Sequence, residues 1–207
     1  MLYLANPSTE NIRKVMSAGT LGYIATPTST YTTQRVEGAK WCADNGCFGK
    51  KYNEEKWWKW LQVQVPWIDS CLFATAPDVV GDAAATLALA EIWLPKIRSL
   101  GYPVALVAQD GLENMVVPWD EFDCLFIGGT TDWKLGEGVR ELTAEAKRRG
   151  KWVHIGRVNS NKRFRYSAFE LQADSCDGTY LIFGPDINLP KLLKWVDGIS
   201  VKQLELF

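Results

Sequence analysis

Histidine is nearly absent from this chain, because His154 is the only one among its 207 residues. The five cysteines are scattered and include no Cys-x-x-Cys pair, so the sequence lacks the clustered side chains of a zinc site. Their odd number and apolar surroundings favour free thiols in a reducing compartment. Glycine-rich phosphate-binding motifs and a readable serine–histidine–aspartate order are also missing. We therefore expect no metal and no cofactor.

The chain also lacks a large net charge, which is −1 at pH 7. The 23 basic residues nearly balance the 24 acidic ones, so any contact with nucleic acid must come from a local patch. No apolar run approaches the length of a membrane span, and residues 1–7 lack the basic start and long apolar core of a signal peptide. We expect a soluble, cytoplasmic protein with no membrane partner.

The hydrophobic fraction is 47%, which suffices for a sizeable core, and with no break in composition we expect one domain over residues 1–207. Apolar runs that stop at a polar residue or a glycine predict eight strands: Leu2–Ala5, Leu21–Thr26, Lys40–Asp44, Cys71–Ala76, Val104–Ala108, Cys124–Ile127, Trp152–Ile155 and Ala173–Asp177. Helices are predicted over residues 11–16, 53–64, 136–149, 162–171 and 189–196, and between Asp82 and Gly101. This alternation indicates parallel strands and predicts a closed (β/α)8 barrel of the TIM type, with an open doubly wound sheet as the alternative.

In such a barrel the carboxyl ends of all strands meet at one rim, where the active site lies. The predicted rim carries Asp44, Asp78, Gln109, Asp110, Gly128, Gly129, Arg157 and Asp177. Two or three carboxylates around an apolar cavity suit chemistry through an oxocarbenium-like centre, where one attacks or shields the anomeric carbon and another handles the proton of the leaving group. They also suit a flat base, since carboxylates accept hydrogen bonds from ring N–H and amino groups.

The stretch Asp44-Asn45-Gly46-Cys47-Phe48-Gly49 resembles the Asp-Ser-Gly-Gly-Phe-Gln motif of the tRNA-guanine transglycosylases. Segments 76–78, 107–111, 126–129, 154–157 and 173–177 resemble further motifs of that family in the same order. The similarity is closest to short phage and bacterial DpdA-like proteins, which are associated with 7-deazaguanine modification of DNA. The resemblance implies a barrel enzyme that breaks an N-glycosyl bond in nucleic acid and inserts a free modified base. It is compatible with a phage protein acting in the host cytoplasm.

Carried over residue by residue, the resemblance makes Asp177 the nucleophile on C1′ and Asp44 the neighbouring acid and base. It assigns base binding to Asp78, Gln109, Gly128, Gly129 and Phe48. The zinc motif of the family and its subdomain are missing, and Cys47 and Gly49 depart from its first motif. These departures favour DNA over tRNA. They leave open a DNA glycosylase that hydrolyses the bond, a non-catalytic nucleobase- or nucleic-acid-binding barrel, and a small-molecule enzyme such as a nucleoside hydrolase.

Basic and aromatic residues interleave in Asn159–Tyr166, directly after a predicted strand end. This pattern suits a phosphate backbone with stacked bases, and the target base would be single-stranded or flipped. We expect backbone contacts from Lys50, Lys51, Lys134, Arg157, Lys162, Arg163 and Arg165. The alternative for residues 162–165 is the solvated side of a helix.

Several candidates also have structural interpretations. Asp-Asn-Gly at residues 44–46 is a strong turn signal, and so is Asp177-Gly178. Asp78 and Asp82 both precede a helix, and we predict that Asp82 is its N-cap and that Asp78 is functional.

Three other candidates are weaker. Asp174 competes with Asp177 for the nucleophile but should point the other way on its strand. Asp123 begins a strand and should lie at the wrong end of the barrel. His154 is more typical of a core or supporting residue than of a catalyst.

The tryptophans of residues 57–60 are predicted to pack a helix.

Overall fold

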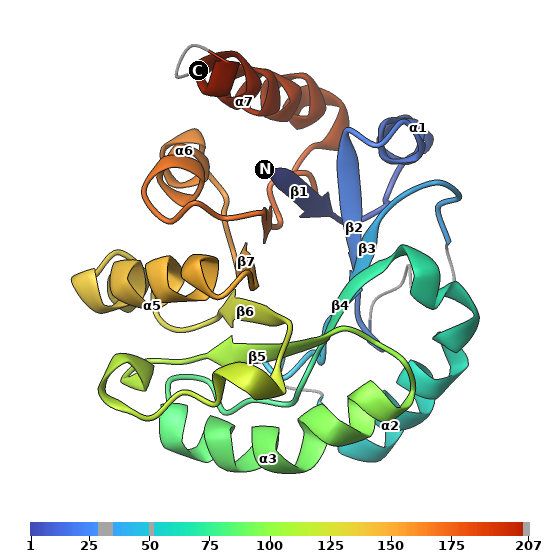
Figure 1. Cartoon of the computed structure of the whole chain (residues 1–207). Coiled ribbons are helices and arrows are strands. Elements are labelled where there is room, and N and C mark those ends of the chain that lie inside the picture. The colour runs from blue at the N-terminus through green and yellow to red at the C-terminus, as the bar shows by residue number, and fades with distance from the viewer. Residues whose placement is uncertain (29–34, 50–51, 205–207) are drawn as a thin grey trace.

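The computed structural model describes residues 1–28, 35–49 and 52–204, which form a closed barrel of eight parallel strands (Figure 1). The strands are β1 (Leu2–Ala5), β2 (Leu21–Ala25), β3 (Trp41–Ala43), β4 (Cys71–Thr75), β5 (Val104–Ala108), β6 (Cys124–Ile127), β7 (Trp152–Ile155) and β8 (Ser175–Asp177). Each strand pairs with the next, and β8 pairs with β1 to close the ring. The predicted (β/α)8 barrel is confirmed, and the open-sheet alternative is wrong.

Helices surround the ring (Figure 1). They are α1 (Glu10–Ser17), α2 (Glu54–Val63), α3 (Ala83–Ser99), α4 (Thr131–Lys134), α5 (Glu137–Arg148), α6 (Asn161–Phe169) and α7 (Pro185–Leu204), with 3-10 turns η1 (Val65–Ser70), η2 (Leu112–Asn114) and η3 (Trp119–Glu121). The two short turns η2 and η3 stand where a helix would link β5 to β6. The last helix, α7, packs against α6 and α1, where the barrel closes. Within the described ranges, no helix combines the length and apolar character needed to cross a membrane.

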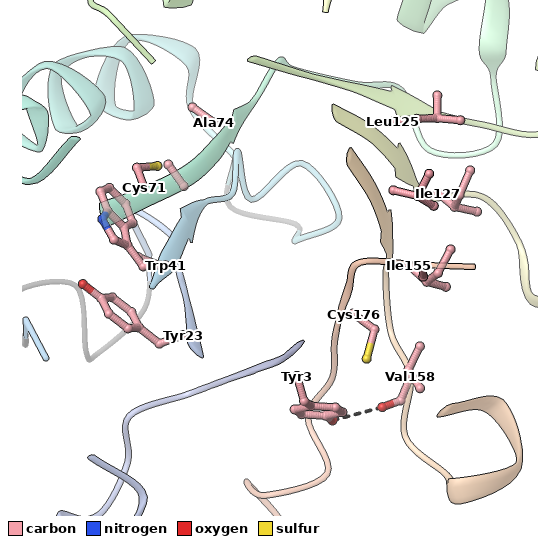
Figure 2. Close-up of a cluster of buried hydrophobic side chains, with 14 of the residues drawn as sticks. Tyr3, Tyr23, Trp41, Cys71, Ala74, Leu125, Ile127, Ile155, Val158 and Cys176 are labelled. Atoms are coloured by element: carbon pink, nitrogen blue, oxygen red, sulfur yellow. Dashed lines mark hydrogen bonds between the residues drawn. The ribbon is translucent and has the colours of Figure 1, made fainter. Parts of the chain in front are cut away.

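Side chains along the strands alternate between the barrel interior and the layer beneath the helices. The interior is filled by a cluster that includes Leu4, Cys42, Phe73, Val107, Cys124 and Phe126. The alternate positions pack outward under the helices, as Tyr3, Ile155 and Cys176 do in Figure 2. The hydroxyl of Tyr3 donates to the carbonyl oxygen of Val158 at 3.0 Å, which ties β1 to the chain leaving β7.

Two structural interpretations made from the sequence hold. Asp82 is the N-cap of α3, and its side chain accepts a hydrogen bond from the backbone N–H of Ala85 at 2.9 Å. Trp57 is fully buried and meets Trp93 of α3 edge-on, with ring centroids 5.0 Å apart. The tryptophan-rich helix therefore packs against its neighbour, as predicted.

Candidate active site

A cavity of about 390 Å³ opens at the carboxyl ends of the strands, within the size range of small-molecule sites. Its walls include seven of the predicted site residues: Asp44, Phe48, Asp78, Gln109, Gly128, Arg157 and Asp177. Three of them, Asp44, Gln109 and Asp177, stand two residues beyond inward-facing strand positions, so the strand alternation turns their side chains inward. Residues predicted from the sequence to share a site therefore line one cavity in the structure. Their roles in binding or catalysis stay predictions.

Asp44 is half-buried at the end of β3. Burial raises the pKa of its carboxyl to about 7, and the nearby charges of Asp177 and Asp78 act in the same direction. Hydrogen bonds from the backbone N–H groups of Gly46 and Asn45 oppose this rise in pKa. Near neutral pH the carboxyl group thus populates both protonation states, which suits transfer of a proton to and from a substrate.

Asp177 is held through one of its two oxygens. Its Oδ1 lies 3.1 Å from Nε2 of His154 and accepts the backbone N–H of Arg157 at 3.3 Å. Among the described residues, Oδ2 has no hydrogen-bond partner. The carboxylate is therefore oriented while one oxygen stays available to a ligand in the cavity.

Two carboxamides fix the carboxylate of Asp78. Nε2 of Gln109 donates to its Oδ2 at 2.6 Å, and Nδ2 of Asn45 donates to its Oδ1 at 2.8 Å. Burial raises the pKa of Asp78, and these two hydrogen bonds act against that rise. The other end of each amide is anchored, because Gln109 accepts the N–H of Gly81 and Asn45 accepts the N–H of Cys47. The turn after β3 thus engages both residues: Asn45 accepts the N–H of Cys47, while Asp44 accepts the N–H of Gly46 and also lines the cavity.

Arg157 joins two neighbouring loops of the rim. Its backbone adopts a left-handed conformation with φ of 64°, which is uncommon outside glycine. The guanidinium donates to the carbonyl oxygens of Gly128, at 2.5 Å, and Gly129, and it lies 4.4 Å from the ring of Phe48. The structure engages this guanidinium with the protein while Arg157 also lines the cavity, and its predicted contact with a phosphate stays a prediction.

Lys134 also contacts a carbonyl oxygen of the protein. The side chain is buried, and its Nζ donates to the carbonyl oxygen of Gly156 at 2.6 Å. Burial, together with the charge of Arg157, lowers the pKa of this amine to about 8. The structure thus directs this ammonium onto a carbonyl oxygen of the protein, and its contact with a nucleic-acid backbone stays a prediction.

The remaining predicted phosphate contacts lie on α6 or outside the described residues. Lys162 is exposed, and Arg163 and Arg165 are half-buried, on a helix that begins at the rim after β7. The guanidinium of Arg165 lies 5.5 Å from the ring of Phe169 on the same helix. Lys50 and Lys51 fall outside the described residues.

Gly128 and Gly129 follow β6, and neighbouring side chains of the protein occupy the space where a Cβ would lie. A Cβ on Gly128 would lie 2.7 Å from Cγ1 of Val107 and 2.8 Å from Nε2 of Gln109. A Cβ on Gly129 would collide with the ring of Trp133, and Gly129 does not line the cavity. Gly129 therefore packs against Trp133 and Gly128 lines the cavity, and the role of both glycines in admitting a base stays a prediction.

We expect Gly128→Ala to displace Gln109 from Asp78 and to lower the free energy of unfolding by about 1–3 kcal/mol, because overpacking forces neighbouring side chains to move. Urea denaturation measures this change. Gly198→Ala in α7 is the matched control, because its added methyl meets nothing within 4 Å and alanine favours a helix by up to about 1 kcal/mol. Equal effects from the two substitutions would contradict the steric argument.

Two acidic residues considered as alternatives lie away from the cavity. Asp123 precedes β6 at the amino ends of the strands, where it bonds Arg98 at 3.0 Å and the N–H of Val104 at 2.8 Å. Asp174 bonds Nζ of Lys147 at 2.7 Å on the helix-covered side of the barrel. Both residues are therefore structural, as their positions on the strands predicted.

Three residues that hold the site carboxylates are missing from the predicted site: His154, Ser175 and Asn45. His154 and Ser175 are register partners on β7 and β8, and both face the barrel interior. The available signal was the alternation along these strands, which puts Ser175 on the same side as Asp177.

Among the described residues, no group of three or more His, Cys, Asp or Glu side chains is placed to hold a metal ion.

No protein-family model matches the chain, and no curated protein matches its sequence. The fold is similar to that of a solved structure described as QR15, an aldolase, with a TM-score of 0.53 and 16% identity over 93% of this chain and 95% of that one. It is also similar to the FimX EAL domain of Xanthomonas citri in complex with c-diGMP, with a TM-score of 0.43 and 16% identity over 69% of this chain. That second alignment covers 58% of the EAL domain chain. At 16% identity the likeness to the aldolase shows a shared barrel fold and nothing about activity.

Proposed function

We propose that this protein breaks an N-glycosyl bond in a nucleic acid, with DNA favoured over tRNA, as a base-exchanging transglycosylase of the 7-deazaguanine type. The observation that carries the proposal is a pair of carboxyl groups with different environments in one cavity. Asp44 has its pKa raised to about 7, whereas Asp177 is oriented by His154 and keeps one oxygen free. Carboxyl groups whose environments differ in this way can divide acid and nucleophile roles.

In the proposed first step, Oδ2 of Asp177 forms a bond to C1′ while the bond from C1′ to the base nitrogen breaks. The electron pair of that bond goes to the base, and the proton of Asp44 is delivered to it. In the second step a nitrogen of the incoming base attacks C1′, its proton passes to Asp44, and the bond to Asp177 breaks. Water in place of the incoming base would give hydrolysis with the same two residues.

The leaving and incoming bases would be held by Asp78 and Gln109. The carboxylate of Asp78 is fixed by two amide donors, and its oxygens retain lone pairs for ring N–H and amino groups. The side chain of Phe48 is 66% exposed and borders the cavity under the guanidinium of Arg157, where a base can stack on it. This arrangement suits a flat base with adjacent hydrogen-bond donors.

The decisive experiment incubates the protein with end-labelled single-stranded and duplex DNA, and with RNA, in the presence and absence of a free labelled 7-deazaguanine base. Incorporation of the label supports base exchange. Abasic sites formed without added base support the hydrolysing glycosylase instead. Tight binding of the oligonucleotide with neither product supports the non-catalytic binding barrel. Failure to bind or convert DNA or RNA in any modification state contradicts all three.

A free nucleoside is the second candidate substrate, because the cations of Arg157 and Lys134 bind carbonyl oxygens and leave fewer charges for a phosphate backbone. If the substrate is a polymer, replacing Lys162, Arg163 and Arg165 by alanine should weaken binding. It should also reduce the slope of log affinity against log salt by about 2, for three lost contacts to a single strand. For a nucleoside, KM should not change.

Titration of a fluorescent oligonucleotide at several salt concentrations measures the slope. Lys191→Ala combined with Lys194→Ala is the control, since both lysines are exposed on α7. An unchanged slope in the α6 variant, together with cleavage of a free nucleoside, would replace the polymer by the small substrate.

A further inference from the structure

A chain of four side chains runs through the interior of the barrel on β7 and β8. The indole Nε1–H of Trp152 donates to Oγ of Ser175 at 2.8 Å. Oγ of Ser175 lies 2.8 Å from Nδ1 of His154, and Nε2 of His154 lies 3.1 Å from Oδ1 of Asp177. The chain therefore ends on the carboxylate that faces the cavity.

The donor and acceptor capacities of these groups favour one arrangement of the protons. An indole N–H only donates, so Ser175 accepts from Trp152 and its own proton is available to Nδ1 of His154. An ionised carboxylate only accepts, so the contact with Asp177 requires a proton on Nε2. A neutral imidazole with its proton on Nε2 satisfies all four members at once.

The surroundings of His154 separate it from the substrate. Its side chain is fully buried, with its ring centroid 4.5 Å from that of Phe126 and 5.1 Å from that of Phe73. It does not line the cavity, and both of its nitrogens are engaged. His154 is thus poorly placed to exchange a proton with a bound substrate, but it is well placed to act on Asp177.

We infer that His154 is a positioning residue, locked by Ser175 as the Nε2–H tautomer, which holds Oδ1 of Asp177 and thereby selects Oδ2 as the oxygen presented to the cavity. The terminal torsion of an aspartate is broad, so a carboxylate without such a tether rotates and exchanges its two oxygens. The N–H of Arg157 holds the same Oδ1 from a second direction. We call the hydrogen bond from His154 to Oδ1 of Asp177 the tether. The tether does not depend on the proposed function, but a nucleophilic role for Oδ2 does.

Nuclear magnetic resonance tests the tether without any activity, because His154 is the only histidine and its ring gives a single pair of nitrogen signals. In ¹⁵N-labelled protein we expect a protonated Nε2 and an unprotonated Nδ1. Ser175→Ala should shift the Nδ1 signal and leave Nε2 protonated. A proton on Nδ1, a doubly protonated ring, or an Nδ1 signal unmoved by Ser175→Ala would overturn the inference.

The kinetic arm uses His154→Phe, which fills the same space between two phenylalanines and removes both hydrogen bonds. We expect kcat to fall by about 100-fold with KM nearly unchanged, since a displacement near 1 Å of a reacting group has an effect of this size. Phe73→Leu is the matched control, because Phe73 packs against the imidazole ring and is not part of the cavity lining. It should lower stability and keep kcat.

The outcomes separate the tether from the proposed function. The expected nitrogen signals in a protein inactive on every glycoside would support the tether and count against the proposed function. An active protein whose kcat survives His154→Phe would overturn the positioning role alone, and so would an equal loss of kcat in Phe73→Leu. If His154→Phe does not fold, the Ser175→Ala spectrum decides the matter.

Discussion

Asp177→Asn is expected to lower the rate of glycosyl transfer by about 10⁴-fold or more, because an amide does not form the covalent bond to C1′ and effects of this size follow removal of a nucleophile. Binding should persist. Asparagine keeps the volume of the side chain and an oxygen that accepts the Nε2–H of His154, so the cavity retains its shape. Single-turnover measurements with enzyme in excess report the chemical step separately from binding.

Asp174→Asn is the matched control, three residues earlier in the chain. Its carboxylate bonds Lys147 and the N–H of Val153 on the far side of the strand, so its loss should cost about 1 kcal/mol of stability and leave the rate unchanged. Retention of the wild-type rate by Asp177→Asn would rule out a nucleophilic role. An equal loss in both variants would point to a shared structural effect.

The fold was predictable because buried parallel strands appear in the sequence as short, continuous apolar runs. The predicted bounds of β5, β6 and β7 match the structure, and the count of eight runs implied closure. Short elements and helix ends were harder to predict. The helix α4 spans only Thr131–Lys134, which is too short for a periodic pattern. The long helix α7 begins at Pro185, four residues before its predicted start. Proline at the first helical position is favoured, but this signal is weak beside Pro190 farther along.

The acidic part of the site was also predictable, since each strand end contributes a residue to the same rim. The link from Ser175 through His154 to Asp177 was not, because it depends on the register between β7 and β8. That register follows from the stagger of the whole barrel and not from local sequence. The surroundings of two predicted cations could not be read from the sequence either, for a different reason. Composition shows that Lys134 and Arg157 are charged, but only the packing shows that they turn inward onto carbonyl oxygens.

Asp44→Asn is expected to change activity and stability in opposite directions. A pKa of about 7 in place of 3.8 means that the folded protein favours the protonated carboxyl. As the pH rises from about 4 to 7, the unfolded chain releases this proton first and the folded state binds more protons, so stability falls across that window. The full shift corresponds to about 4 kcal/mol above pH 7, and solvent contact at the cavity reduces the expected effect to about 2 kcal/mol.

The asparagine variant carries no ionisable group at this position. It should therefore be more stable than the wild type by about 2 kcal/mol at pH 8 and similar to it near pH 4, as measured by urea denaturation across this range. Its loss of the acid should lower the rate of base departure by about 10²–10⁴-fold, and the wild-type rate should fall as the pH rises through 7.

Asp82→Asn separates the buried charge from a general effect of removing a carboxylate, because asparagine is an equally good N-cap and Asp82 is exposed. It should alter neither the rate nor the dependence of stability on pH. A wild-type rate that is flat between pH 6 and 8, together with equal stability of the wild type and Asp44→Asn at pH 8, would show that Asp44 is ionised at no energetic cost. A group without that cost does not serve as the acid near neutral pH, and the proton would then have to come from elsewhere in the cavity.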